Sequence, residues 1–186
     1  MPTLEEYQKD IVASNTAAGW YEDTRTLGEE CALLHSEISE MFEAYRDNEF
    51  KPYFHQVGLL GMGSGVMLQG VAPEGVKPEG VGSEVADVFI RLLDACHRLD
   101  MPIDEVFEAS EAANVDVNGT FGDTITKLHK IVSDLYTSGN PLAMMGKLLA
   151  SLQVVCSKYD LELTTEVDLK LAYNKTREYR HGGKTI

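Results

Sequence analysis

Positive charge is scarce in this sequence. Sixteen lysines and arginines stand against 30 aspartates and glutamates, which gives a formal net charge of −14. Duplex DNA, RNA and anionic membranes are bound through basic surfaces, so neither a nucleic acid polymer nor a membrane is expected as the main partner. A small polyanionic substrate remains compatible with this charge, provided that metal ions and a local basic cluster offset the acids.

Long apolar runs and cysteines are also rare. No run approaches the about 18–20 unbroken apolar residues of a membrane span, and the first residues, Met-Pro-Thr-Leu-Glu-Glu, lack the basic and apolar regions of a signal peptide. The cysteines Cys31, Cys96 and Cys156 lie far apart, and none belongs to a Cys-x-x-Cys pair. They are expected to be reduced core residues of a cytoplasmic protein.

Capped segments with a helical apolar period dominate the remainder. The chain of 186 residues is 44% hydrophobic and suits a single domain, 1–186, with about seven helices and an all-α fold. The tail from Arg180 to Lys184 is not expected to lie inside a helix. We expect helices at 3–14, at 26–47, at 84–99 with Ser83 as its cap, from Pro102 to about 113, from Asp123 or Thr124 onward, from Asn140 onward, and from Thr164 or Thr165 to about Arg177.

The segment 50–82 interrupts this helical pattern. It is rich in glycine and has no helical period, which predicts a connector that packs down or forms a short hairpin. Its Gly61-Met62-Gly63-Ser64-Gly65 run lacks the Gly-Lys-Ser/Thr ending of a phosphate-binding loop, so no such loop is expected there.

A weak internal repeat has a shift of sixty residues. The shift lays Cys96 on Cys156 and Asp100 on Asp160, and it continues with Asn114 on Asn174. It also places Met144 and Lys147 where Glu84 and Asp87 stand, so a second copy would have lost its acids. Either the chain is a degenerate duplication, or two amphipathic hairpins resemble each other by chance.

Two helices of strongly apolar character carry paired acids. Glu37 and Glu40 are three residues apart on the expected helix 26–47, and Glu84 and Asp87 repeat the step on the next one. If these helices pack side by side, four carboxylates converge and repel one another unless cations lie between them. Hard oxygen ligands suit Mg²⁺ or Mn²⁺. The alternative is a pair of solvated acidic faces, since the same spacing recurs elsewhere in the chain.

Two further groups are candidates for binding. Trp20, the single tryptophan, is either a ring that closes over the core or a flat face for stacking a base, with Asn15 contacting the base edge. Lys170, Asn174 and Arg177 fall on one stripe of the last long helix, either as a solvated basic face or as a phosphate and sugar site.

Several sequence words together resemble a known family. They are Leu34-His35-Ser36-Glu37-Ile38-Ser39-Glu40, Glu84-Val85-Ala86-Asp87-Val88, and Asn174-Lys175-Thr176-Arg177. The pattern is similar to the MazG-like all-α nucleoside triphosphate pyrophosphohydrolases of phages and actinobacteria, whose relatives include dimeric dUTPases and dCTP pyrophosphatases. Relative to that family, residues 115–160 look like an insert.

The resemblance implies hydrolysis of a (deoxy)nucleoside triphosphate to the monophosphate and pyrophosphate, which would adjust the nucleotide pool. It implies two or more Mg²⁺ or Mn²⁺ ions held by Glu37, Glu40, Glu84 and Asp87, with Glu37 or Glu40 as the catalytic proton acceptor. It further implies a homo-oligomer, a dimer or tetramer, in the host cytoplasm if the protein is encoded by a phage. By analogy dGTP is expected ahead of dCTP or dUTP.

Two other classes remain open at this stage. One is a different Mg²⁺-dependent phosphohydrolase that attacks a terminal phosphate or a diester. The other is a non-enzymatic helical interaction module whose acids are merely solvated.

Overall fold

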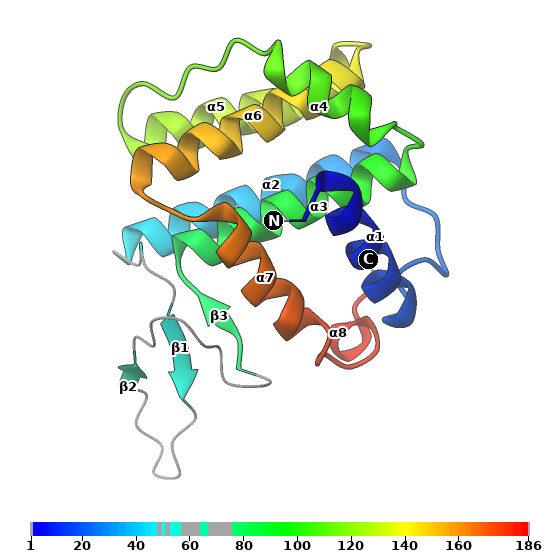
Figure 1. The fold of residues 1–186 in the computed structure, drawn as a ribbon, viewed down its shortest axis with the longest axis vertical. Coiled ribbons are helices and arrows are strands. Elements are labelled where there is room, and N and C mark those ends of the chain that lie inside the picture. The colour runs from blue at the N-terminus through cyan, green and yellow to red at the C-terminus, as the bar shows by residue number, and fades with distance from the viewer. Residues whose placement is uncertain (1, 48–49, 51–52, 57–63, 67–75, 186) are drawn as a thin grey trace.

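The protein is a bundle of helices, as its sequence predicts (Figure 1). The computed structural model describes residues 2–47, 50, 53–56, 64–66 and 76–185. Within that part, seven helices have nine or more residues, and α8 is a single short turn. The helices are α1 (Leu4–Ala17), α2 (Leu27–Arg46), α3 (Val81–Arg98), α4 (Ile103–Glu111), α5 (Phe121–Thr137), α6 (Pro141–Tyr159), α7 (Leu163–Asn174) and α8 (Arg180–Gly183).

Capping side chains explain where several helices begin. Thr3 and Thr26 each accept a hydrogen bond from the backbone N–H three residues on, in complete capping boxes. A third capping box, at Thr120, lies three or four residues before the expected start of α5 at Asp123 or Thr124. The expectation that Ser83 caps α3 was wrong, because α3 begins at Val81. Ser83 lies inside the helix and donates instead to the carbonyl oxygen of Pro78, at 2.8 Å.

The C-terminal tail also differs from expectation. Residues 180–183 form α8, and the N–H of Lys184 donates to the carbonyl oxygen of Arg180 at 2.9 Å. Gly182 and Gly183 have φ values of 90° and 88°, which glycine adopts without steric cost. The turn closes there because these two residues lack a Cβ atom.

The connector 50–82 contains a small antiparallel sheet in its described residues. The strands are β1 (Tyr53–Gln56), β2 (Ser64–Val66) and β3 (Pro78–Glu79), in the order β2-β1-β3. The expected hairpin therefore exists as β1 and β2. Most of the Gly61–Gly65 run lies outside the described residues, as do residues 51–52, 57–60 and 67–75 of the connector.

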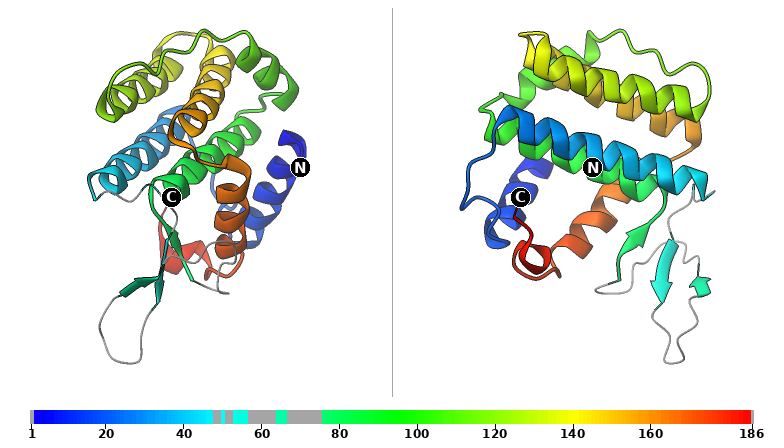
Figure 2. Two further views of the ribbon diagram at one scale, coloured as in Figure 1. Left: turned by 60° about the vertical axis from the view of Figure 1, so that its left-hand side comes forward. Right: turned by 180° about the vertical axis from the view of Figure 1, so that it is seen from behind.

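The long helices form layers around α3 (Figure 2). The α2–α3 pair lies between the α5–α6 pair on one side and α1 and α7 on the other. Fourteen of the 18 residues of α3 are buried, including polar Ser83, Glu84 and Asp94. Any acid on α3 is therefore close to the core and needs a partner.

The helices α6 and α7 repeat α3 and α4. A shift of sixty residues carries the first residue of α3 onto that of α6, and the first residue of α4 onto that of α7. Both hairpins turn at an aspartate in the left-handed region, Asp100 with φ 52° and Asp160 with φ 57°. In both, the next N–H donates at 2.9 Å to the carbonyl oxygen of the equivalent cysteine, Cys96 or Cys156.

The helix α5 likewise repeats α2, with a shift of 94 residues. The capping box at Thr26 corresponds to that at Thr120, and Leu34 and His35 correspond to Leu128 and His129. We call α2–α4 the first unit and α5–α7 the second unit. The last helix of each unit packs on the other unit, since α4 contacts α6 and α7 contacts α3. The expected insert 115–160 thus contains α5 and α6, the first two helices of the second unit.

Candidate metal centre

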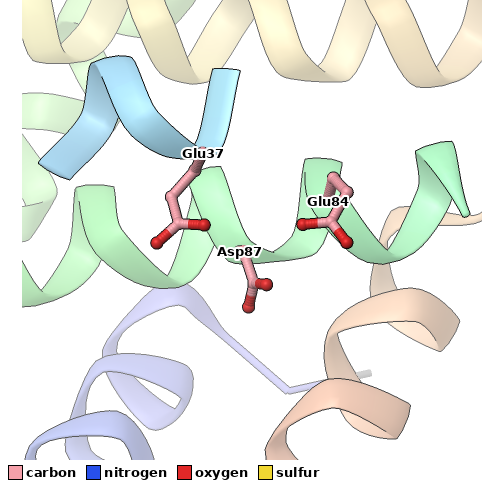
Figure 3. Close-up of side chains that lie close together, drawn as sticks. All are labelled: Glu37, Glu84 and Asp87. Atoms are coloured by element: carbon pink, nitrogen blue, oxygen red, sulfur yellow. The ribbon is translucent and has the colours of Figure 1, made fainter. Parts of the chain in front are cut away.

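Three of the four predicted acids converge. One carboxylate oxygen from each of Glu37, Glu84 and Asp87 lies within 4.8 Å of the others (Figure 3). The neighbour of Glu37 on α2, Ile38, is fully buried, so α2 holds Glu37 at the edge of its apolar stripe. The three-residue step on α3 places Glu84 and Asp87 on one face. We call Glu37, Glu84 and Asp87 the acid trio.

Glu40 does not belong to the acid trio. Its side chain is exposed, and its carboxylate accepts a hydrogen bond from Ser36 Oγ at 3.3 Å. It lines the same pocket as Glu37 and Asp87. The expected cluster of four acids is therefore a trio with a fourth acid at its solvent edge.

Two basic side chains partly neutralise the acid trio. The ammonium nitrogen of Lys170 lies 2.6 Å from Asp87 and donates to Ser83 Oγ at 2.9 Å, with only 2% of the Lys170 side chain exposed. The Nε atom of Arg91 lies 3.0 Å from a carboxylate oxygen of Glu37. Because α7 crosses α3 here, the structure pairs Lys170 with an acid, whereas the sequence predicted that it would contact a phosphate.

The remaining negative charge is under-compensated at Glu84. Its Oε2 atom is buried and has no hydrogen-bond partner among the described residues. Burial raises the pKa of Glu84 to about 7 although Lys170 opposes the shift, and the charge of Asp87 adds to it. Burial and Asp87 also raise the pKa of Glu37, against the effect of Arg91.

This arrangement fits a divalent cation. Three carboxylates offer hard oxygen donors to a common point, and an orphaned Glu84 oxygen is the kind of atom that an ion satisfies. Oxygen-only donors favour Mg²⁺ or Mn²⁺ over softer metals. The residues that could hold the ion are Glu37, Glu84 and Asp87, with Glu40 within the same pocket.

The predicted phosphate and sugar residues border that pocket, whose volume is about 210 Å³. Asn174 and Arg177 line it together with Lys77 and Lys184, and the buried Oδ1 atom of Asn174 has no hydrogen-bond partner among the described residues. Two further cations near the C-terminus pair with acids elsewhere: Lys175 lies 3.4 Å from Asp10, and Arg180 lies 2.6 Å from Asp23.

The predicted base-binding residues lie at the same pocket. The Nδ2 atom of Asn15 donates to Asp94 Oδ1 at 2.9 Å. Trp20 is 5% exposed, and the Arg25 guanidinium carbon lies 5.4 Å from the centroid of its ring. This burial is the arrangement expected of a ring that closes over the core. Stacking on a base would require its face to be uncovered.

Sequence reasoning missed a buried polar network that continues from the acid trio. Asp94 accepts hydrogen bonds from Tyr21 Oη at 2.6 Å and from Arg98 Nε at 3.1 Å, and Glu30 and Arg25 lie beside them. A signal for this network was present in the helix period. The charged positions 87, 91, 94 and 98 recur at steps of four, three and four, on one face of α3.

A buried acid on α7, Glu166, was also missed. Burial raises its pKa to about 7, with Lys170 opposing the shift, and its Oε2 atom has no hydrogen-bond partner among the residues described. Gly82 makes room for it, because a Cβ atom at position 82 would lie 2.6 Å from the Glu166 carboxyl carbon. Glu166 and Lys170 thus both bring buried polar groups to the contact between α3 and α7.

The second unit supplies an internal comparison. Its equivalent contact, between α6 and α4, is built without this polar layer. The sixty-residue shift replaces Glu84, Asp87, Arg91, Glu166 and Lys170 by Met144, Lys147, Ser151, Val106 and Ser110. The same helix packing therefore forms without buried acids, and the acid trio is not a requirement of the fold.

No family model matches the chain, and comparison with curated proteins and with solved structures gives no match. The resemblance to the MazG-like family therefore stays a prediction. Among the described helices, none combines the length and the apolar content of a membrane span.

Proposed function

We propose that the protein is a Mg²⁺- or Mn²⁺-dependent nucleoside triphosphate pyrophosphohydrolase, which releases pyrophosphate and a nucleoside monophosphate. The observation that carries the proposal is the acid trio with its unpartnered Glu84 oxygen, present in the first unit and replaced in the second. Buried acids are costly, and the second unit packs without them, so their presence calls for a function. The MazG-like sequence words supply the reaction class.

The acid trio would hold the metal, with Glu40 as a further ligand if a second ion binds. A bound ion would neutralise phosphate charge and lower the pKa of its bound water. Positioning and charge neutralisation dominate this chemistry, so the protein itself needs no nucleophile.

A proton must leave the attacking water, and Glu40 is the better placed of the two predicted acceptors. Glu37 already interacts with Arg91 at 3.0 Å, whereas the exposed carboxylate of Glu40 accepts only from Ser36 within the described part of the chain. A carboxylate free of cations retains its capacity to accept a proton.

The substrate would lie along the pocket beside the acids. Lys77, Arg177 and Lys184 line it and supply positive charge for the triphosphate, and the orphaned Asn174 Oδ1 can accept a hydrogen bond from a sugar hydroxyl. The pocket is smaller than the about 300–1,000 Å³ that is typical of ligand sites, so part of the nucleotide would project beyond it.

The physiological setting follows from the resemblance. A guanine nucleotide such as dGTP is the first candidate, ahead of dCTP or dUTP, and the role would be adjustment of the nucleotide pool. The contact of α7 with α3 places Lys170 of the second unit against Asp87 of the first, so one chain brings both units to its site. A dimer or tetramer of such chains remains the proposed assembly.

The test is a screen of the eight common ribo- and deoxyribonucleoside triphosphates with Mg²⁺ or Mn²⁺, in which pyrophosphate and inorganic phosphate are measured separately. Pyrophosphate release that is lost in Glu84→Gln and Asp87→Asn, but kept in Glu43→Gln on the exposed face of α2, supports the proposal. Release of inorganic phosphate alone would indicate another phosphohydrolase. If no triphosphate is hydrolysed, the proposal fails and the non-enzymatic interaction module becomes the favoured alternative.

A further inference from the structure

A second cavity lies in the second unit, with a volume of about 310 Å³. Residues of α5 and α6 form most of its lining, together with the segment that follows α4. Its charged residues are Lys127, Lys130, Lys147, Asp116 and Asp134. Nothing in the proposed hydrolysis uses this cavity.

The repeat relates this cavity to the candidate metal centre. The 94-residue shift pairs residues of α2 with residues of α5: Leu33 with Lys127, Ser36 with Lys130, Glu37 with Ile131, and Glu40 with Asp134. The sixty-residue shift pairs Asp87 with Lys147 and Asn114 with Asn174. All twelve of these residues line one or the other of the two pockets. The second cavity is therefore the counterpart of the first pocket and occupies the same place in its unit.

The second cavity differs from the first pocket in the charge of its lining residues. Each member of the acid trio is replaced, Glu37 by Ile131, Glu84 by Met144 and Asp87 by Lys147, so the acids that would hold a metal are missing. Two added lysines, Lys127 and Lys130, stand where the first pocket has an apolar and a neutral polar residue. At the pocket-lining position of Asp87 the repeat thus changes an acid to a base, Lys147.

The positive charge of the cavity is not fully paired. Lys127 lies 2.8 Å from Asp116, and Lys130 lies 2.6 Å from Asp134. Lys147 is half-buried, and its ammonium group has no ion-pair or hydrogen-bond partner among the described residues. Three lysines against two aspartates leave a local positive site on a chain whose net charge is −14.

We propose that this cavity binds a phosphate-bearing anion directly, without a divalent metal. Lys147 would supply the unpaired charge, Lys127 and Lys130 the flanking charge, and Asn114 an amide donor at the rim. Because each member of the acid trio is replaced there, the cavity is expected to bind the anion and not to hydrolyse it. The phosphate can come from a free pyrophosphate or from a nucleotide.

The test is calorimetric titration of inorganic pyrophosphate into the full chain in EDTA and low salt. Removal of divalent ions makes the result independent of the proposed hydrolysis. Wild type is expected to bind one pyrophosphate per chain, and Lys147→Met to weaken binding about tenfold, as expected when one cation–phosphate contact is lost. Arg177→Met, which lies in the first pocket, should leave the affinity unchanged.

Two results would overturn the proposal: no binding in EDTA, or binding that Arg177→Met weakens and Lys147→Met does not. A parallel titration with a nucleoside monophosphate separates the two sources of phosphate. Tighter binding of the monophosphate would assign the cavity to a nucleotide, and tighter binding of pyrophosphate would assign it to the free anion. Lys147 is partly exposed, and a thermal melt of Lys147→Met confirms that the variant is folded.

Discussion

The ammonium nitrogen of Lys170 lies 2.6 Å from a carboxylate oxygen of Asp87, although the two residues belong to different units. The last helix of the second unit, α7, thus places a buried cation beside the acids of the first unit. Lys170 and Arg91 are two cations against three neighbouring carboxylates, and the Oε2 atom of Glu84 stays without a hydrogen-bond partner in the described structure. Lys170 and Arg91 therefore hold two members of the acid trio in place, while Glu84 keeps an unpartnered oxygen, the atom on which the proposed metal site depends.

The first prediction concerns this ion pair. Lys170→Met keeps the length of the side chain but removes its charge, which leaves Asp87 beside Glu84 without compensation. Loss of one partner of a buried pair costs about 3 kcal/mol, somewhat less here because 19% of the Asp87 side chain is exposed. Urea denaturation without metal should show this loss.

Addition of Mn²⁺ should raise the midpoint of Lys170→Met more than that of wild type, because the ion then replaces the missing positive charge. Lys175→Met, whose exposed side chain pairs with Asp10, is the matched control and should barely shift the midpoint. Equal stability of Lys170→Met and wild type would refute the role of Lys170.

The second prediction concerns a histidine pair at the contact of α2 with α5. The Nδ1 atoms of His35 and His129 lie 2.8 Å apart and their rings stack at 5.0 Å, so one neutral ring donates to the other. Burial lowers the pKa of His35, and burial together with the charge of His35 lowers that of His129. The unfolded chain, with a histidine pKa of about 6.5, then takes up protons before the folded chain does.

The histidine pair should consequently make stability fall as the pH drops from about 7.5 to about 5.5, a window that begins above the unfolded histidine pKa, whereas the raised pKa values of Glu84 and Glu166 contribute a slope of the opposite sign. A double variant, His35→Asn with His129→Asn, should lose part of this slope in melting temperature against pH. The same slope in the double variant and wild type would exclude the pair as its cause.

The third prediction concerns the close contact of α4 with α6. A Cβ atom at Gly146 would lie 2.6 Å from the Ala109 Cβ atom and 2.8 Å from the backbone nitrogen of Ser110. Backbone atoms cannot move aside cheaply, so Gly146→Ala should destabilise the protein by about 1–3 kcal/mol.

Gly122→Ala on α5 is the control for this substitution. The nearest atoms to its added Cβ would be Thr120 Oγ1 at 3.7 Å and Phe42 at 3.9 Å, which are ordinary contacts. It should be neutral or stabilising, by up to about 1 kcal/mol, since alanine is favoured over glycine in a helix. Urea midpoints of the two variants compare them directly, and a neutral Gly146→Ala would contradict the packing of α4 on α6.

Local signals made most of the fold predictable from sequence. The capping boxes at Thr3 and Thr26, and Asn140 followed by Pro141, act within one helical turn, and the apolar stripes fix which face is buried. The tail was mispredicted because glycines such as those at 182 and 183 usually follow the end of a helix. Here they belong to the single turn of α8 itself.

The candidate site was only partly predictable, because its geometry depends on how distant helices cross. Helix period placed the acid pairs on α2 and α3, but it could not show that Glu40 faces solvent or that α7 brings Lys170 onto Asp87. The repeat of α2 in α5 was present in the sequence. It was missed because the connector after α2 is far longer than that after α5, so no single shift aligns both pairs of helices.

Direct titration of Mn²⁺, followed by the electron paramagnetic resonance signal of the free ion, tests the metal centre. Wild type should bind Mn²⁺, and Glu84→Gln and Asp87→Asn should each lower the affinity at least about tenfold. Loss of a residue that merely supports a metal ligand already costs about that much, so loss of a ligand should cost no less. Glu40→Gln, outside the acid trio, should weaken binding far less. Wild-type affinity in both Glu84→Gln and Asp87→Asn would contradict the acid trio as a metal site, and the proposed hydrolysis would lose its basis.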